Sequence, residues 1–277
     1  MQSHSTGIRN LKFDEYKEIL IPLPPLPEQK RIVATLDKCF AAIDKTKASA
    51  EQNLKNTKEL FESYLENLFC ALFNSGEKKI VSEIANVIGG YSFKSSDFKT
   101  FGNYQVIRMG NVRPGIIREN ENPVFIDKLN EKALSKALLL PNDVIITQTG
   151  TKKKRDYGFT AIIEKNNYLL NQRLAAIRFS KLCLPKYFLY FSWTTIFKDQ
   201  FFANETGTVG QGNVGIGAIT DAYIPFVTVK QQEIIIKKVD TLRTETQKLE
   251  TVYQKKETDL DELKKSILQK AFAGDLK

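Results

Sequence analysis

Cations, amides and hydroxyls gather in three stretches of the middle of the chain, where they could bind a polyanion. These stretches read GGYSFKSSDF, RMGNVRPG and TQTGTKKKRDYG. Lys and Arg side chains pair with phosphate groups, and Arg, Asn and Gln side chains form hydrogen bonds with base edges. The residue types therefore favour a nucleic-acid interface, with an ordinary solvated loop tip as the alternative for the cations at 152–155.

The strongest candidates lie in the third stretch, where the strand-like run NDVIITQ would fix the base of a flexible tip that enters a groove. The candidates in this tip are Lys152, Lys153, Lys154, Arg155 and Tyr157. A second group of candidates is spread over all three stretches and a later strand: Ser92, Lys94, Arg108, Asn111, Arg113, Gln148, Thr149 and Arg173.

The charge of the chain is concentrated in the same middle segment. The whole chain of 277 residues has a formal net charge of +9, and residues 77–223 hold 20 Lys and Arg against 13 Asp and Glu. A basic balance in one segment fits a polyanionic partner, although such a charge also serves solubility alone.

Composition and motifs argue against several other classes. No apolar run approaches the roughly 18 residues of a membrane span, and the N-terminus has no apolar signal core, so a cytoplasmic location is expected. Cys39, Cys70 and Cys183 contain no CxxC pair and the only histidine is His4, so neither a disulfide scaffold nor a metal site is expected.

Residues for catalysis are not found either. The chain has no GxxxxGK[ST] phosphate loop, no Asn-Pro-Pro-aromatic tetrapeptide and no glycine-rich strand-turn-helix pattern. We therefore predict no catalytic residues. A self-contained DNA-modifying enzyme stays an alternative, which methyl transfer by the isolated chain would establish.

The elements that must position these loops are short strands and helices. Strand-like runs YQVIRM, NDVIITQT, GFTAIIEK and RLAAIRFS are separated by Gly, Asn and Pro signals, with helical patches between them. This pattern predicts a compact mixed α/β domain over residues 77–223, and an α+β fold class for the chain.

Both ends of the chain read as long helices. Apolar residues recur at alternating steps of three and four, and a long helix with one apolar stripe needs a partner in water. We expect an antiparallel coiled coil, with Leu36 near Leu263 or Ile267; two separate helices on a globular core are the alternative. Its predicted core positions are Leu36, Ile43, Leu54, Leu242, Leu249, Leu263 and Ile267.

Nearly the same amino-acid sequence stands at the start of both predicted helices. IPLPPLPEQKRIVATLD occupies 21–37 and IPFVTVKQQEIIIKKVD occupies 224–240, and the same offset aligns ELFESYLENLFCALF with ELKKSILQKAFAGDL further along. Each copy has an Ile-Pro start, a glutamine near the helix start and a long helix. This is a duplicated unit.

With these residues, the chain resembles the DNA-specificity subunits of Type I restriction-modification systems. The repeated unit, the opening VSEIANVIGGYSFKSSDF with YQVIRMGNVRPG, and the closing GQGNVGIGAITDAYIPF carry the resemblance over nearly the whole chain. It implies a target recognition domain at 77–223, spacer helices at 28–76 and 224–277, and at 1–27 the tail of a missing or split recognition domain. The chain would then be either a half-length subunit that forms a homodimer or a truncated gene product.

The resemblance also implies a function and partners. Such a subunit binds double-stranded DNA sequence-specifically at a bipartite site and has no activity of its own. It directs modification (M) subunits, which use S-adenosylmethionine, and through the complex restriction (R) subunits, which use ATP and Mg²⁺. The chain itself would hold no cofactor. A structural coiled-coil scaffold stays an alternative, which salt-sensitive, sequence-selective DNA binding would argue against.

Overall fold

The structure is a computed structural model that describes residues 2–3, 9–10, 13–208 and 210–276. His4 lies outside the described residues. The chain forms two compact units: residues 59–246, and residues 1–58 together with 247–277. Helices and sheets are mixed as the predicted α+β class requires, so that prediction is confirmed.

The unit of residues 59–246 is built on a four-stranded antiparallel sheet in the order β11-β9-β13-β4. Its inner strands are short runs of Val, Ile, Leu and Ala that are buried, as expected for strands covered on both faces. The strands are β4 (Ala85–Gly89), β9 (Val144–Thr147), β11 (Thr160–Ile162) and β13 (Leu174–Phe179).

A second sheet in this unit has the order β12-β5-β8, with β12 parallel to β5 and β8 antiparallel to it. A short helix, α4, packs beside it and is capped at its start by the side chain of Asn130, which accepts a hydrogen bond from the Ala133 backbone N–H. The elements are β5 (Tyr104–Ile107), β8 (Phe125–Ile126), β12 (Tyr168–Leu170) and α4 (Glu131–Ala137).

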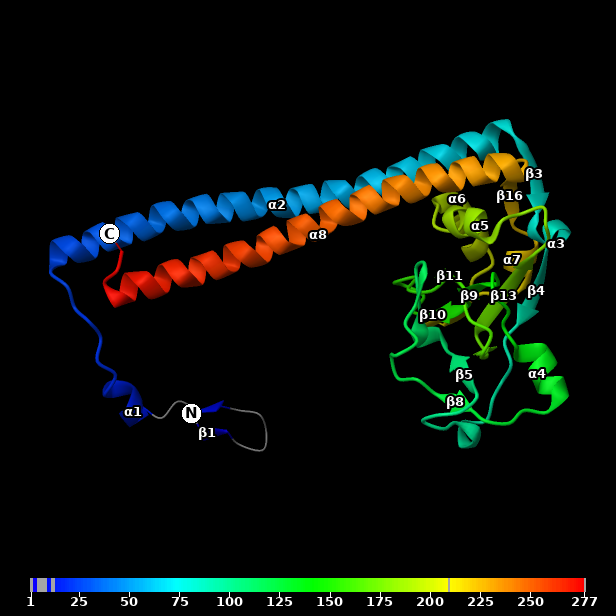
Figure 1. Ribbon diagram of the computed structural model, residues 1–277, viewed down its shortest axis with the longest axis horizontal. Helices are drawn as coiled ribbons and strands as arrows, with labels where there is room; N and C mark the ends of the chain where they lie inside the picture. The colour runs from blue at the N-terminus through cyan, green and yellow to red at the C-terminus, as the bar shows by residue number, and fades with distance from the viewer. Residues whose placement is uncertain (1, 4–8, 11–12, 209, 277) are drawn as a thin grey trace. The chain divides into compact units, whose positions relative to one another are not determined.

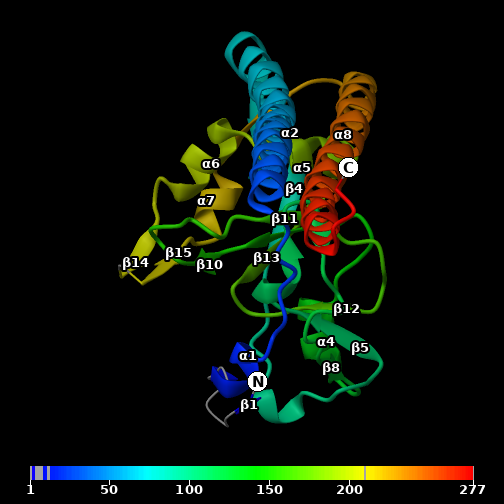
Figure 2. The same ribbon diagram turned by 90° about the vertical axis from the view of Figure 1, so that its left-hand side faces the viewer.

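Three small sheets complete the strands of this unit. Two are the pairs β3 (Glu77–Ile80) with β16 (Tyr223–Phe226), and β6 (Val112–Arg113) with β7 (Ile116–Ile117). The third has the order β10-β15-β14, and Figure 2 shows it reaching out to one side of the domain. Its strands are β10 (Thr149–Gly150), β14 (Thr206–Thr208) and β15 (Gln211–Asn213).

An aromatic core joins the first sheet to the helices of this unit. Phe188, Phe191, Phe197 and Phe201 are buried against one another, with ring centroids 5.3–5.8 Å apart along the pairs 188–197, 191–197 and 197–201. Phe69 of the first long helix joins the cluster. The remaining helices and 3₁₀ turns are α3 (Val81–Ile84), α5 (Pro185–Phe191), α6 (Thr195–Phe202), α7 (Gly217–Thr220), η1 (Ser95–Asp97) and η2 (Met109–Asn111).

The other unit is built from parts of the two long helices, α2 (Leu26–Ser75) and α8 (Val229–Ala273). These parts run side by side in opposite directions (Figure 1), because Lys47 pairs with Asp261 at 2.7 Å and Asp44 with Lys264 at 2.9 Å. The unit also contains β1 (Gln2–Ser3), paired antiparallel with β2 (Arg9–Asn10), and α1 (Phe13–Lys17). The antiparallel pairing was predicted and is present here.

Five of the seven predicted core positions are covered, and two are not. Ile43 is buried, and Leu36, Leu54, Leu242 and Ile267 are half-buried. Leu249 and Leu263 are 43% and 48% exposed, so their prediction as core residues is wrong.

The reason lies in the phase of the heptad repeat. The covered positions of α8 beyond residue 246 are Glu250, Tyr253, Glu257, Leu260, Lys264, Ile267, Leu268 and Ala271. Apart from Leu268, this set keeps the alternating steps of three and four, but it contains Glu250 in place of Leu249 and Lys264 in place of Leu263, so the heptad was predicted in the wrong phase.

The ion pairs show that the predicted neighbours of Leu36 are offset along α8. The two ion pairs set a register in which Leu36 lies level with Phe272, five residues beyond Ile267. Among the helices of the described residues, none is long and apolar enough to cross a membrane.

Candidate nucleic-acid interface

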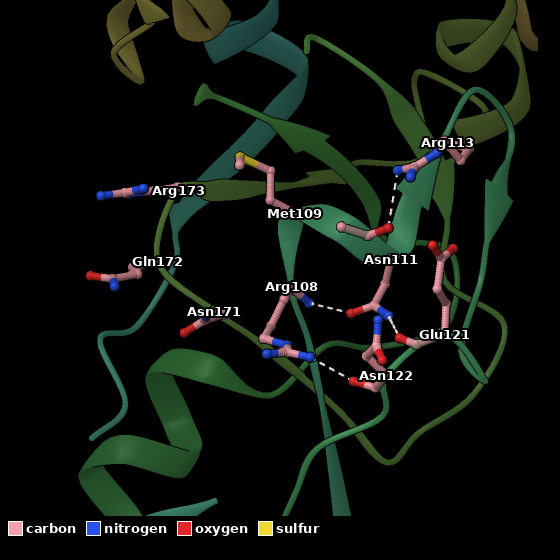
Figure 3. Close-up of a pocket in the computed structure, with 10 residues that line it drawn as sticks. Arg108, Met109, Asn111, Arg113, Glu121, Asn122, Asn171, Gln172 and Arg173 are labelled. Carbon is pink, nitrogen blue, oxygen red and sulfur yellow. Dashed lines mark hydrogen bonds between the residues drawn. The ribbon is translucent and has the colours of Figure 1, made fainter. Parts of the chain in front are cut away.

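A polar cavity of about 460 Å³ opens on the domain where three loops meet. Figure 3 shows the side chains around it, which come from the turn η2 after β5, from β6, from the loop after β7 and from the connection between β12 and β13. We call it the arginine cavity, and its polar side chains include Arg108, Arg113, Arg173, Asn122, Asn171 and Gln172. The three arginines were candidates from the sequence.

The floor of the arginine cavity is held by Asn111. Its side-chain oxygen accepts the Arg108 backbone N–H at 3.0 Å, and its amide nitrogen donates to the carbonyls of Arg118 at 3.1 Å and Glu121 at 2.7 Å. The residue is buried and both amide N–H groups are used. Asn111 therefore shapes the loop, and its amide has no N–H group left to donate to a base.

The three arginines are held to different degrees. Arg108 donates to the Asn122 carbonyl at 2.5 Å, and Arg113 donates to the carbonyls of Gly110 at 3.0 Å and Val112 at 2.8 Å. The exposed side chain of Arg173 points away from the strands in Figure 3. The arginine cavity thus presents one extended guanidinium beside two that are folded onto backbone.

Backbone strain concentrates at the same place. Arg173 and Asn122 both have positive φ angles, of +68° and +49°. Such conformations cost free energy in residues with side chains and cluster at functional sites, where the surrounding structure holds them. Here the strain turns Arg173 outward immediately before β13 begins.

The strand edge beside Gln172 explains the double glycine of GGYSF. A Cβ on Gly90 would lie 1.9 Å from the Asn171 carbonyl oxygen, so only glycine lets the two backbones approach this closely. The approach brings Ser92 to the cavity edge, where its hydroxyl donates to the Gln172 side-chain oxygen at 3.1 Å. Lys94, two residues on, is exposed and lines neither this cavity nor the next.

A second cavity, of about 370 Å³, adjoins the first and shares Met109, Gly110, Arg113 and Arg173 with it. We call it the threonine cavity. Its other polar and glycine positions come from β9, from β10 and the loop after it, and from the β14–β15 arm: Thr147, Thr149, Gly150, Thr151, Asp156, Gly210 and Gln211. Together the two cavities form a continuous surface of cations, amides and hydroxyls.

The lysine-rich tip lies next to the threonine cavity. Lys153 and Lys154 are exposed, whereas Lys152 is half-buried with its amine 3.5 Å from the Gly207 carbonyl oxygen. Arg155 has its guanidinium 4.7 Å from the Phe202 ring centroid and its Nε 4.0 Å from Glu205. The four cations predicted as one group therefore divide into two that face solvent and two that contact the arm or the core.

Asp156 closes this tip into a turn. Its carboxylate accepts the Thr151 backbone N–H at 2.6 Å and the Thr151 hydroxyl at 3.2 Å. The backbone bond lowers the pKa of Asp156 below its usual range. The turn presents the exposed lysines outward from a base fixed by β10.

The polar groups of three further candidates form hydrogen bonds with other residues of the domain. Tyr157 is buried with its hydroxyl bonded to Glu205, and burial raises its pKa. Gln148 donates to the Val214 carbonyl at 3.0 Å, and the buried Thr149 hydroxyl donates to the Asn213 side chain at 2.7 Å. These side chains fix the β14–β15 arm and are unavailable to a ligand in this conformation.

Comparison with known proteins identifies the family. A family profile described as the Type I restriction modification DNA specificity domain matches residues 1–56 and 76–258. The chain belongs to this family.

The chain is also similar in sequence to named specificity subunits. The chain is 25% identical over 292 residues to the Type I restriction enzyme EcoKI specificity subunit of Escherichia coli K12, covering 99% of this chain and 61% of that subunit. It is 24% identical to the EcoBI specificity subunit of Escherichia coli, covering 98% of this chain and 61% of that subunit. The chain therefore spans about three fifths of the length of these relatives.

A solved chain from a study of complex assembly and conformational transition in a type I R-M system shares the fold. It matches with a TM-score of 0.78 at 20% identity, over 99% of this chain and 67% of that one. The specificity-domain fold therefore positions the two cavities.

Sequence reasoning missed several residues of the site. Asn122, Asn171 and Gln172 line the arginine cavity, and Gln211 lines the threonine cavity. Asn171 and Gln172 directly precede Arg173 at the end of a buried strand, a position where polar side chains commonly form sites, and that signal could have found them.

Within the described residues, no group of three or more His, Cys, Asp or Glu could hold a metal ion.

Proposed function

We propose that the chain is a sequence-specific DNA-recognition subunit of a Type I restriction-modification complex and that it is not itself a catalyst. The observation that carries the proposal is the continuous surface of the two cavities, with three arginines, three asparagines and two glutamines on it, in a chain of the specificity-domain family. These are the residue types that read base edges in the major groove.

Roles divide by how each side chain is held. Arg173, Gln172 and Asn171 follow one strand and face the arginine cavity, which suits base reading. Lys153 and Lys154 stand on the exposed tip beside the threonine cavity and suit phosphate contacts, which position a protein on DNA without selecting sequence.

The partners follow from the same proposal. We infer that M subunits, with S-adenosylmethionine, carry out methyl transfer, and that R subunits, with ATP and Mg²⁺, act through the complex, while this chain holds no cofactor. One recognition domain reads a short element, so a bipartite target needs a second domain. A homodimer of this chain is one way to supply it, and that is part of the proposal.

The proposal is tested by DNA binding across salt concentrations. Duplexes selected by the full chain from a randomised pool are compared with scrambled duplexes of equal composition. Lys153→Ala with Lys154→Ala should weaken binding to both duplexes and flatten the salt dependence by about two units of slope. Arg173→Ala should instead cost about 1–3 kcal/mol on the selected duplex and relax preference at one base pair.

Lys181→Ala is the matched control, because Lys181 is an exposed cation of the same unit that lines neither cavity. Its binding should equal that of the original chain. Unchanged binding by the two cavity variants, or an equal loss in the control, would contradict the proposed interface.

The partner proposal has its own test. Removal of residues 247–277 leaves the unit of residues 59–246 intact. It takes away the part of α8 that pairs with α2 in the other unit. Co-purification with M subunits should be lost while binding to DNA persists. Retained association would place the docking surface on the recognition domain.

A further inference from the structure

The hairpin of β6 and β7 carries Arg113 into both cavities and is supported from behind by two side chains. Its turn is Pro114–Gly115, and Gly115 has a φ of +73°. A Cβ on Gly115 would lie 2.8 Å from Cζ2 of Trp193 and 3.1 Å from Nη2 of Arg243. The turn therefore rests directly on a tryptophan and an arginine, and only glycine fits there.

Trp193 and Arg243 come from different elements and are stacked on each other. Trp193 follows α5, Arg243 lies on α8, and the guanidinium carbon lies 4.6 Å from the indole ring centroid. Tyr190 and Phe61 contact the same indole edge to face, with centroids 5.3 Å and 6.3 Å away. The indole N–H is buried without a hydrogen-bond partner in the described residues, so packing and the cation–π contact hold the ring.

The backbone of the turn is tied to the same support. The Gly115 N–H donates to the Thr160 carbonyl at 2.7 Å, and the Thr160 hydroxyl shares a 2.7 Å hydrogen bond with Ser192. Ser192 directly precedes Trp193, and both Thr160 and Ser192 are buried. The hairpin, β11 and the end of α5 thus form one connected block.

The orientation of Arg113 depends on this block. Arg113 pairs with Ile116 across the hairpin, two residues from Gly115, and its guanidinium bonds to backbone of the same loop. A shift of the turn would move the guanidinium relative to Arg173, with which it shares both cavities.

We infer that Arg243 of α8 is a positioning residue for DNA recognition: by holding Trp193 against Gly115 it sets where Arg113 presents its guanidinium. The inference rests on the proposed function, and it gives a residue of a long helix, outside both cavities, a role in sequence preference. Arg243 acts through Trp193 and the hairpin and contacts no base.

The first experiment needs no DNA. Hydrogen exchange of backbone amides in residues 112–117 is compared in the full chain, in Arg243→Met and in Lys238→Met. Lys238 is an exposed cation of the same helix, so the control removes the same charge without touching Trp193. Exchange should rise about tenfold in Arg243→Met and stay unchanged in Lys238→Met.

Arg243→Lys keeps the charge but loses the planar stacking, so its exchange should fall between the two. Far-ultraviolet circular dichroism, which does not depend on the packing of Trp193, checks that each variant is folded. Unchanged exchange in a folded Arg243→Met or Arg243→Lys protein would overturn the inference.

The second experiment is a double-mutant cycle on sequence preference. The selected duplex, single-base-pair variants of it and the scrambled duplex serve as probes. Arg113→Ala should lower preference at one base pair by about 5- to 100-fold. Arg243→Met should lower preference at the same base pair by a smaller factor, and the double variant should match Arg113→Ala, because the two residues act as one unit.

The outcomes separate this inference from the proposed function. If the two single effects multiply, or if only Arg113→Ala changes preference, then Arg243 does not position Arg113 and DNA recognition stands. If the original chain prefers no duplex, the proposed function fails and the positioning role fails with it, whatever the exchange experiment shows about the hairpin.

Discussion

The two copies of the repeated unit differ in what covers them. Ile224, in the second copy, is 1% exposed, and its strand β16 pairs antiparallel with β3. Ile21, the residue at the same place in the first copy, is 72% exposed, and its neighbours Leu20 and Leu23 are exposed as well. The two similar sequences therefore differ in burial, because the unit of residues 59–246 supplies the surface that covers Ile224 in the second copy.

What the copies share is the local structure at the start of the helix. Gln29 donates to the Pro24 carbonyl at 2.7 Å, and Gln232 donates to the Val227 carbonyl at 2.9 Å, the same contact at the same spacing. Gln232 makes two more hydrogen bonds, to the backbone of Leu182 and Leu184. The glutamine is a local cap in both copies and a link to the domain in one.

The prolines mark a second difference. In the second copy Thr228 and Gln231 form a reciprocal capping pair, with the Gln231 side chain accepting the Thr228 N–H at 3.0 Å and the Thr228 hydroxyl accepting the Gln231 N–H at 3.4 Å. In the first copy Pro25 precedes the helix and Pro27 lies in its first turn, where a missing N–H costs nothing. Prolines thus start α2, whereas a reciprocal side-chain cap starts the equivalent helix α8. The second copy therefore does not need the prolines.

The largest expected contrast is at the two isoleucines. Ile224→Asp should destabilise the protein by about 3–5 kcal/mol, because a carboxylate would replace a core side chain without a partner. Ile21→Asp should change the free energy of unfolding by no more than about 0.5 kcal/mol, as exposed substitutions do. Urea unfolding followed by far-ultraviolet circular dichroism measures both, and equal losses would contradict a difference in burial.

The glutamines should show a smaller contrast. Gln232→Ala should cost about 2 kcal/mol, because it removes three hydrogen bonds and leaves the Leu184 N–H without its acceptor. Gln29→Ala removes one half-exposed bond and should cost about 0.5 kcal/mol. Thermal unfolding is the measurement, and a loss in Gln29→Ala as large as that in Gln232→Ala would mean that the local cap dominates.

The aspartates that end the repeated unit come next. Asp240 accepts hydrogen bonds from the Tyr190 hydroxyl and, at 2.8 Å, from the Lys186 amine, whereas Asp37 is exposed. Asp240→Asn should cost about 1 kcal/mol, since the Lys186 pair is partly solvated. Asp37→Asn should be neutral in the same urea titration. A neutral Asp240→Asn would show that the tyrosine contact adds nothing to the docking of α5 on α8.

The fold was predictable to the extent that local patterns express it. The repeat, the long helices and the strand runs are sequence-periodic, and each corresponds to an element of the structure. Which heptad positions of α8 are covered was not predictable, because Leu249 and Glu250 are adjacent and only the phase against α2 decides between them.

The site was predictable by residue type and less by role. Arg108, Arg113 and Arg173 lie together as their chemistry suggested. Asn111 and Tyr157 look identical to base-reading residues in the sequence, yet their polar groups are bonded inside the domain. Hydrogen-bond partners brought by distant strands decide such cases, and no local pattern records them.

The smallest expected effect concerns a seam position where the copies differ in polarity. Ile43 and Thr246 occupy equivalent places in the repeat and are both buried, at 6% and 3% exposure. The Thr246 hydroxyl donates only to the helix carbonyls of Leu242 and Arg243, at 3.0 Å each. Those carbonyls accept backbone N–H groups in any case, so the hydroxyl adds little that the helix needs.

Thr246→Val should therefore stabilise the protein by about 0.5 kcal/mol, because an apolar group of the same shape replaces a buried hydroxyl and no partner is left unsatisfied. Ile43→Val, which removes one methylene from the first copy, should cost about 1 kcal/mol. Paired urea titrations measure the change in the free energy of unfolding for each variant. Changes of opposite sign would show that this buried position tolerates a threonine without requiring it. A loss in Thr246→Val would mean instead that the hydroxyl contributes to the pairing of the helices, and the two copies would then differ in their seam as well as in their covering.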